Sequence, residues 1–161
     1  MKRARQVAVI GSGTCERGSE AWTLAEEVGR RLAEAGATVV CGGLGGVMEA
    51  AAAGAAGAGG EVIGIVPGVS IDEASPHCTH VVASATGRAR NLAVVASGAV
   101  VIAVGGEWGT LSEIGHARQF GRTVVALRSW ELTGRERMEG APGVIPVEDP
   151  EEAVRAALEA I

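Results

Sequence analysis

Short runs of β-branched and other apolar residues alternate along this chain with longer segments of helical periodicity. Such alternation is typical of βαβ units around a parallel sheet, because parallel neighbours need a crossover helix between them. In the segment 20–35, Leu24, Val28 and Leu32 recur every four residues, and Gly36 follows as a helix stop. The pattern predicts strands over residues 7–10, 39–41, 62–66, 100–104, 124–127 and 144–147, with a short extra strand over 79–82.

Further helices are expected over residues 47–56, 88–97 and 110–120, and after Asp149, which stands before Pro150 as a typical N-cap. A charged stretch over 128–143 is predicted to be an irregular excursion. Residues 1–161 therefore predict one α/β domain, a three-layer α/β/α sandwich. Right-handed crossovers favour a parallel sheet in the strand order 3-2-1-4-5-6, numbered without the short strand.

Charge and composition bear on the partners of the chain. Its 161 residues include 14 basic and 19 acidic side chains, a net charge of −5, which argues against the basic surface that nucleic acids require. An aromatic content of 2% also argues against stacking platforms for single strands. We therefore expect no nucleic-acid partner.

Cysteine spacing indicates whether the chain can form metal sites or disulfides, and the length of its apolar runs indicates whether it has a membrane segment. The three cysteines form no CxxC pair, so neither a structural zinc site nor a disulfide framework is indicated. The run 77–80 (His-Cys-Thr-His) is unfavourable for one metal ion, since adjacent strand residues point to opposite faces. We expect no metal and no resident cofactor. No apolar run has the length of a signal or membrane segment, which predicts a cytoplasmic protein without a membrane partner.

Three glycine clusters, at 11–13, 42–46 and 105–109, each follow a predicted strand and precede a helix. Ligands of such folds bind beyond the carboxyl ends of the strands, where backbone N–H groups and helix dipoles favour anions. The three clusters therefore predict a phosphate-bearing ligand. A dinucleotide is disfavoured, because the third fingerprint glycine is replaced by Glu16 and no acidic residue ends the second strand.

Three segments together resemble the LOG family of cytokinin-activating phosphoribohydrolases, which are often misnamed lysine decarboxylases. The family shows a GGGxxGLMG-like turn, an Arg-Lys pair and a PGGxGTxxE motif. This chain has CGGLGGVME at 41–49, Arg90-Asn91, and GGEWGTLSE at 105–113. The resemblance runs from Val7 to about Leu127.

The resemblance implies a Rossmann-like, usually dimeric protein. It also implies an enzyme that binds a nucleoside 5′-monophosphate and cleaves its N-glycosidic bond. Arg90 and Glu113 would then be the catalytic residues, since a carboxylate stabilises positive charge at the anomeric carbon. Trp108 and Met48 are candidate base contacts, although Trp108 could equally cap a helix and Met48 could be core. The candidate phosphate-binding and nucleotide-binding residues are Gly11, Ser12, Gly13, Gly42, Gly43, Gly46, Gly106, Gly109 and Thr110.

The chain departs from the family pattern at Asn91, Gly105, Glu107 and Glu49. These changes resemble a divergent branch whose relatives include molybdenum-cofactor carriers and DNA-processing proteins. Two functions therefore stay open. One is a nucleoside-monophosphate N-glycosidase that releases base and ribose 5-phosphate, and the other is a non-catalytic carrier of a nucleotide or phosphate-bearing cofactor.

Two further expectations concern structure. A homodimer or a higher homo-oligomer is expected, with the predicted helix segment 92–96 as a candidate face. The segment Thr110-Leu111-Ser112-Glu113 also fits a capping box, which would give Glu113 a purely structural role.

Overall fold

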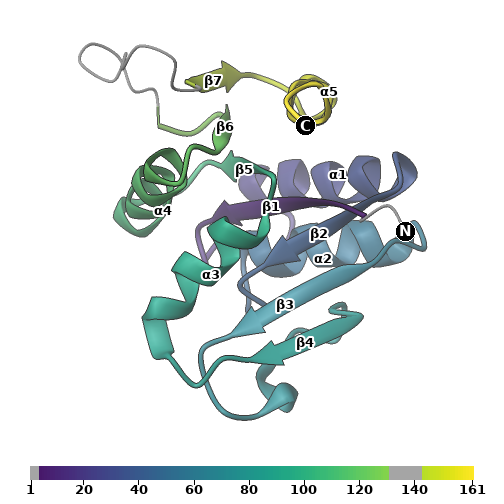
Figure 1. Ribbon diagram of the computed structural model, residues 1–161. Coiled ribbons are helices and arrows are strands. Elements are labelled where there is room, and N and C mark those ends of the chain that lie inside the picture. Colours follow the sequence, from purple (N-terminus) through teal and green to yellow (C-terminus); the bar gives the residue numbers. More distant parts are fainter. Residues whose placement is uncertain (1–3, 131–142) are drawn as a thin grey trace.

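The computed structural model describes residues 4–130 and 143–161. Within these residues one parallel sheet of seven strands runs through the centre of the molecule, in the order β4-β3-β2-β1-β5-β6-β7 (Figure 1). The strands are β1 (Arg5–Gly11), β2 (Ala37–Cys41), β3 (Val62–Val66), β4 (His80–Ala83), β5 (Val100–Val104), β6 (Thr123–Leu127) and β7 (Val144–Val147).

The predicted strand order is confirmed, and the short predicted strand proves to be β4, which extends the sheet beyond β3. Strands β2 and β5 are buried along their whole length, as expected for strands covered on both faces. Strand β4 alternates exposed and half-buried side chains, as an edge strand does.

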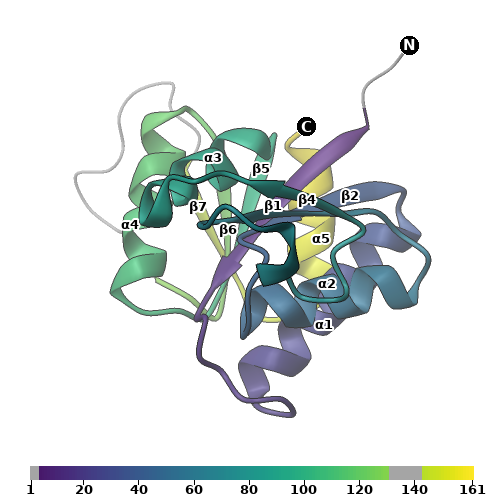
Figure 2. The ribbon, with the colours of Figure 1, turned by 90° about the horizontal axis from the view of Figure 1, so that it is seen from below.

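Helices cover both faces of the sheet, which gives the predicted three layers. One face carries α1 (Glu20–Glu34), α2 (Val47–Gly57) and α5 (Pro150–Glu159), and the other carries α3 (Arg90–Ser97) and α4 (Trp108–Gln119) (Figures 1 and 2). Two 3-10 turns, η1 (Ile71–Glu73) and η2 (Gly87–Ala89), lie in the connection between β3 and α3. The predicted helix over 88–97 therefore begins with a 3-10 turn.

Helices α1 and α2 approach one another closely because glycines stand at their contact. A Cβ at Gly54 would lie 1.8 Å from the carbonyl oxygen of Glu26, and one at Gly29 would lie 2.0 Å from that of Ala51. This close packing fixes α2, whose N-terminus follows the second glycine cluster.

The predicted start of α4 is wrong by two residues. The helix begins at Trp108 with Glu107 as its N-cap, because Gly105 and Gly106 have positive φ angles of 53° and 104° and turn the chain directly after β5. Thr110 therefore lies inside the first turn, buried against Gly106. The capping-box interpretation of Thr110 and Glu113 is wrong as well.

Two expectations can be compared with the structure only over the described residues. The predicted irregular stretch over 128–143 lies mostly outside them, since residues 131–142 are not described. In the described part of the chain, no helix combines the length and the apolar character that crossing a membrane would take.

Candidate ligand-binding site

A cavity of about 740 Å³ lies at the carboxyl edge of the sheet, where the turns after β1, β2 and β5 meet the N-termini of α3 and α4. Its wall brings together nine of the predicted site residues, which come from all three glycine clusters and from three helices, α2, α3 and α4. These are Gly11, Ser12, Gly13, Gly42, Met48, Arg90, Gly109, Thr110 and Glu113.

Close backbone contact joins the first two glycine turns. The Val47 N–H donates a 2.9 Å hydrogen bond to the carbonyl oxygen of Ser12. A Cβ at Gly46, whose φ angle is +65°, would lie 2.3 Å from the same oxygen. Gly46 does not line the cavity, and neither do Gly43, which packs on Val66, and Gly106, which packs on Thr110. Their observed contacts are with the protein itself.

Arg90 is the buried cation of the cavity, with only 8% of its surface exposed. Its Nη2 donates to the carbonyl oxygen of Gly42 at 3.1 Å and lies 3.9 Å from the Met48 sulfur, and its Nη1 donates to the Asn91 side-chain oxygen. Its Nε is buried without a hydrogen-bond partner among the described residues. Burial lowers the pKa of Arg90, against the opposing effect of Glu113.

Glu113 is the buried carboxyl group of the cavity, on the first turns of α4, with 9% of its surface exposed. Burial raises its pKa from 4.5 to about 7, and the positive charge of Arg90 opposes this rise. The described ion pairs do not include one between Arg90 and Glu113. The two groups therefore influence one another through the cavity without neutralising one another directly.

The candidate base contacts fall in different places. Met48 lines the cavity beside Arg90, whereas Trp108 is 76% exposed and does not line it. The Trp108 ring instead lies 5.3 Å from that of Trp130, centroid to centroid. Glu107, the N-cap of α4, is exposed on the wall of the cavity.

Some cavity residues were not predicted as site residues. Arg88 belongs to the 3-10 turn before Arg90 and lines the same cavity, and a second arginine two residues away was the available signal. Asn91 stands at a departure from the family pattern, and His116 lies one helical turn after Glu113. The described residues place no three His, Cys, Asp or Glu side chains together in a metal-binding arrangement.

This arrangement can bind an anion and exchange a proton. Arg90 and Arg88 supply positive charge, and the N-terminus of α4 adds its dipole at the same wall. Glu113 can hold or release a proton near neutral pH.

Comparison with known proteins shows the family of this chain. Residues 4–154 match the model of the SLOG cluster4 family. The chain belongs to this family. An uncharacterized protein of the archaeon Archaeoglobus fulgidus is 39% identical over 149 residues, which cover 92% of this chain and 91% of that protein.

Two solved structures resemble this SLOG cluster4 protein over nearly its whole length. The molybdenum cofactor binding protein of Rippkaea orientalis is 30% identical, with a TM-score of 0.85 and coverage of 99% of this chain and 98% of that one. The molybdenum cofactor carrier protein of Chlamydomonas reinhardtii is 27% identical, with a TM-score of 0.83 and coverage of 98% of both chains. The expected relation to the LOG-like branch with molybdenum-cofactor carriers is thus confirmed.

The expected exclusion of nucleic acid is wrong. The fold of this SLOG cluster4 protein also occurs in DNA processing protein A of Helicobacter pylori, a protein with a single-stranded DNA binding mode, at 19% identity and a TM-score of 0.68. That match covers 96% of this chain and 80% of the other. Net charge and aromatic content are properties of a whole chain, whereas binding depends on local surface, so composition does not exclude nucleic acid for this fold.

Proposed function

We propose that this protein binds a phosphate-bearing, nucleotide-like cofactor of the molybdenum-cofactor class in the carboxyl-edge cavity and carries it without chemical conversion. The observation that carries the proposal is Arg90, a buried cation in the cavity wall whose Nε has no partner among the described residues. A buried guanidinium with spare donor capacity is unfavourable until an anion compensates it.

The size and lining of the cavity support a small organic anion. Its volume of about 740 Å³ lies within the usual range of small-molecule sites. The glycine turns allow backbone to approach a phosphate closely, and Arg90 can offer paired donors to phosphate oxygens. The similarity to a cofactor-binding protein and a cofactor carrier over 98–99% of this chain supports the same ligand class.

Two departures from the LOG pattern favour carriage over turnover. Asn91 replaces a family lysine, and its side-chain oxygen accepts a hydrogen bond from Arg90 instead of adding a second charge. Glu107 adds a carboxylate to the cavity wall. Both changes reduce the positive charge facing a phosphate, which suits a ligand that must be released again.

A second candidate function is the nucleoside-monophosphate N-glycosidase. One observation favours it: the Glu113 carboxyl, with its pKa raised to about 7, lies in the same cavity as Arg90. A group with this pKa can orient and deprotonate water near neutrality, as glycoside cleavage requires.

Binding and turnover assays separate the two functions. The protein is incubated with the molybdenum cofactor and, separately, with AMP, followed by gel filtration and measurement of retained ligand, free adenine and ribose 5-phosphate. The carrier function predicts retained molybdenum cofactor and no adenine release. Adenine release that Glu113→Gln abolishes and Glu27→Gln spares would support the glycosidase instead. Retention of neither ligand would contradict the proposed cavity function.

A further inference from the structure

Two of the three cysteine thiols meet beside the cavity. Cys41, the last residue of β2, is fully buried and pairs in register with Gly64 of β3. Gly64 has no side chain, and the Cys78 sulfur occupies the space that one would fill, since a Cβ at Gly64 would lie 2.6 Å from it. Cys78 therefore lies next to Cys41 on the α1/α2 face of the sheet, packed on the same apolar cluster.

The segment that carries Cys78 is held in place on both sides. The Thr79 hydroxyl accepts a 2.8 Å hydrogen bond from the Val62 N–H and donates a 3.1 Å bond to the Val62 carbonyl oxygen. Before Cys78, the Ser75 N–H donates to the Gly43 carbonyl oxygen at 2.8 Å. The proximity of the two thiols is thus fixed by hydrogen bonds from this segment to the backbone of β3 and of the second glycine turn.

The two thiols differ in acidity and access. They hydrogen-bond to one another, which lowers the pKa of Cys78 and, together with burial, raises the pKa of Cys41. Cys78 is also half-buried, whereas Cys41 is inaccessible. A more acidic, more accessible thiol is the attacking group of a thiol pair, and its buried partner is the resolving group.

We propose that Cys41 and Cys78 form a redox-active pair that closes to an intramolecular disulfide when it meets a low-molecular-weight disulfide. The Cys78 thiolate attacks one sulfur of the reagent, forms a mixed disulfide and releases one thiolate. Cys41 attacks the Cys78 sulfur, the bond between Cys78 and the reagent sulfur breaks, and the Cys41 proton passes to the leaving second thiolate. Two protein thiols are oxidised, and the reagent is reduced to two thiols.

This pair stands one residue from the ligand site. Cys41 precedes Gly42, whose carbonyl oxygen accepts the hydrogen bond from Arg90. The pair is therefore adjacent along the chain to a residue that holds the buried cation, and its chemistry does not rest on the proposed carrier function.

Thiol counting on the native protein tests the pair. The folded chain is treated with glutathione disulfide, and its free thiols are labelled with a maleimide after denaturation and counted by intact mass. We expect a fall from three labels to one, the remaining label on Cys15, and no bound glutathione. Three labels after treatment would overturn the proposal.

Single variants assign the roles. In Cys41→Ser the reaction should stop at one glutathione bound to Cys78, whereas Cys15→Ser should close the disulfide as fast as the native chain. Cys78→Ser should leave Cys41 reduced. A stable glutathione adduct on Cys78 in the native chain, with Cys41 still free, would contradict the resolving role of Cys41.

Discussion

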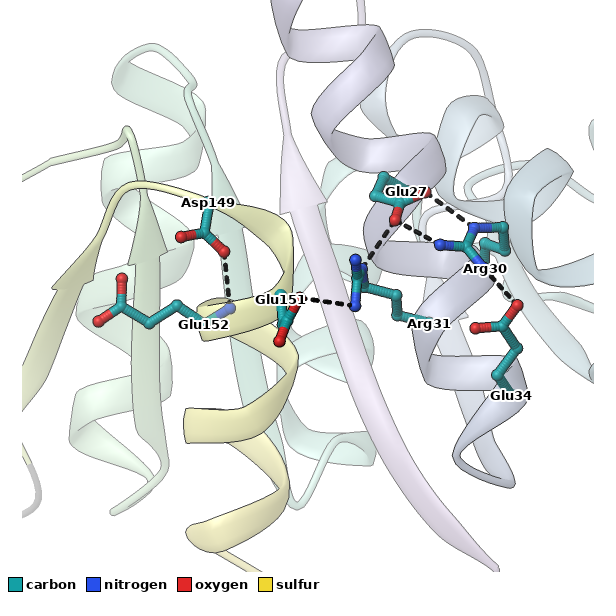
Figure 3. Close-up of polar contacts among 7 residues, drawn as sticks. All are labelled: Glu27, Arg30, Arg31, Glu34, Asp149, Glu151 and Glu152. Atoms are coloured by element: carbon teal, nitrogen blue, oxygen red, sulfur yellow. Dashed lines mark hydrogen bonds and ion pairs between the residues drawn. The ribbon is translucent and has the colours of Figure 1, made fainter.

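Two sets of charged side chains in this molecule differ in their burial and in their ion pairing. On the outer surface of α1 and α5, Glu27 pairs with both Arg30 and Arg31, and Arg31 reaches Glu151 of α5 at 3.3 Å (Figure 3). These side chains are between 32% and 75% exposed. At the carboxyl edge, Arg90 and Glu113 are less than 10% exposed, and neither forms an ion pair with the other or with any other residue that the structure describes.

We propose that the difference separates charges that serve the surface from charges that serve a ligand. Exposed pairs each contribute between zero and about 1 kcal/mol and are screened by salt. Buried charges lose hydration worth several kcal/mol each, which only good partners restore. The burial of Arg90 and Glu113 therefore destabilises the fold in the absence of a ligand. We propose that a ligand bound in their common cavity explains this burial.

The largest expected effect concerns Glu113 and pH. Its pKa is about 7 in the folded chain and 4.5 ordinarily, so between these values the folded state holds a proton that the unfolded state has lost. The free energy of unfolding should therefore fall as pH rises through this interval, by about 3 kcal/mol in total. Glu113→Gln should remove this decline, which urea unfolding between pH 4 and 8 would show.

A surface carboxylate gives the matched control. The pKa of Glu27 is lowered by its hydrogen bonds to Arg30 and Arg31, so its stabilising effect is present above pH 4.5 and lost as pH falls below that. Glu27→Gln should leave the decline above pH 4.5 in place. If both variants keep that decline, the buried carboxyl is not its source.

A middle-sized effect is expected at the rim of the cavity. Glu107 adds a negative charge where a phosphate would enter, and repulsion of about 1 kcal/mol corresponds to about fivefold in affinity. Glu107→Gln should tighten binding of the molybdenum cofactor at low salt by about this factor, and the gain should shrink at high salt. Equal affinities of both proteins at low salt would show that this carboxylate does not face the ligand.

The smallest effect is expected on the surface of α1. Arg31→Met removes the contacts to Glu27 and Glu151, and the free energy of unfolding should fall by less than about 1 kcal/mol. Thermal unfolding at low and high salt would show a difference that salt reduces. A larger loss that salt leaves unchanged would mean that this network resembles the cavity more than an ordinary surface.

The sequence was enough to predict the sheet and to name nine of the residues that line the cavity. Strand order follows from alternating β-branched runs and right-handed crossovers, and the glycine clusters mark the carboxyl edge in advance. The start of α4 was predicted wrongly because Thr110 and Glu113 fit a capping box as sequence, whereas the positive φ angles of Gly105 and Gly106 start the helix earlier.

Other features depend on contacts between distant segments. The Cys41–Cys78 contact arises because Gly64 leaves room in the next strand. No local sequence pattern predicts this contact. The burial of Arg90 and its bond to Gly42 also join segments far apart in the chain. Trp108 was a reasonable base contact by position, but its side chain lies outside the cavity beside Trp130.

Equilibrium titration of the molybdenum cofactor into the native protein, Arg90→Met and Arg31→Met at pH 6 tests the ligand role of the buried charges most directly. At this pH most of the Glu113 carboxyl is protonated and uncharged. Removal of the Arg90 charge therefore changes its free energy little. We expect Arg90→Met to weaken binding at least about tenfold, through lost charge-assisted hydrogen bonds, without lowering the free energy of unfolding. Arg31→Met should bind as the native protein does. Unchanged affinity in Arg90→Met would contradict the account.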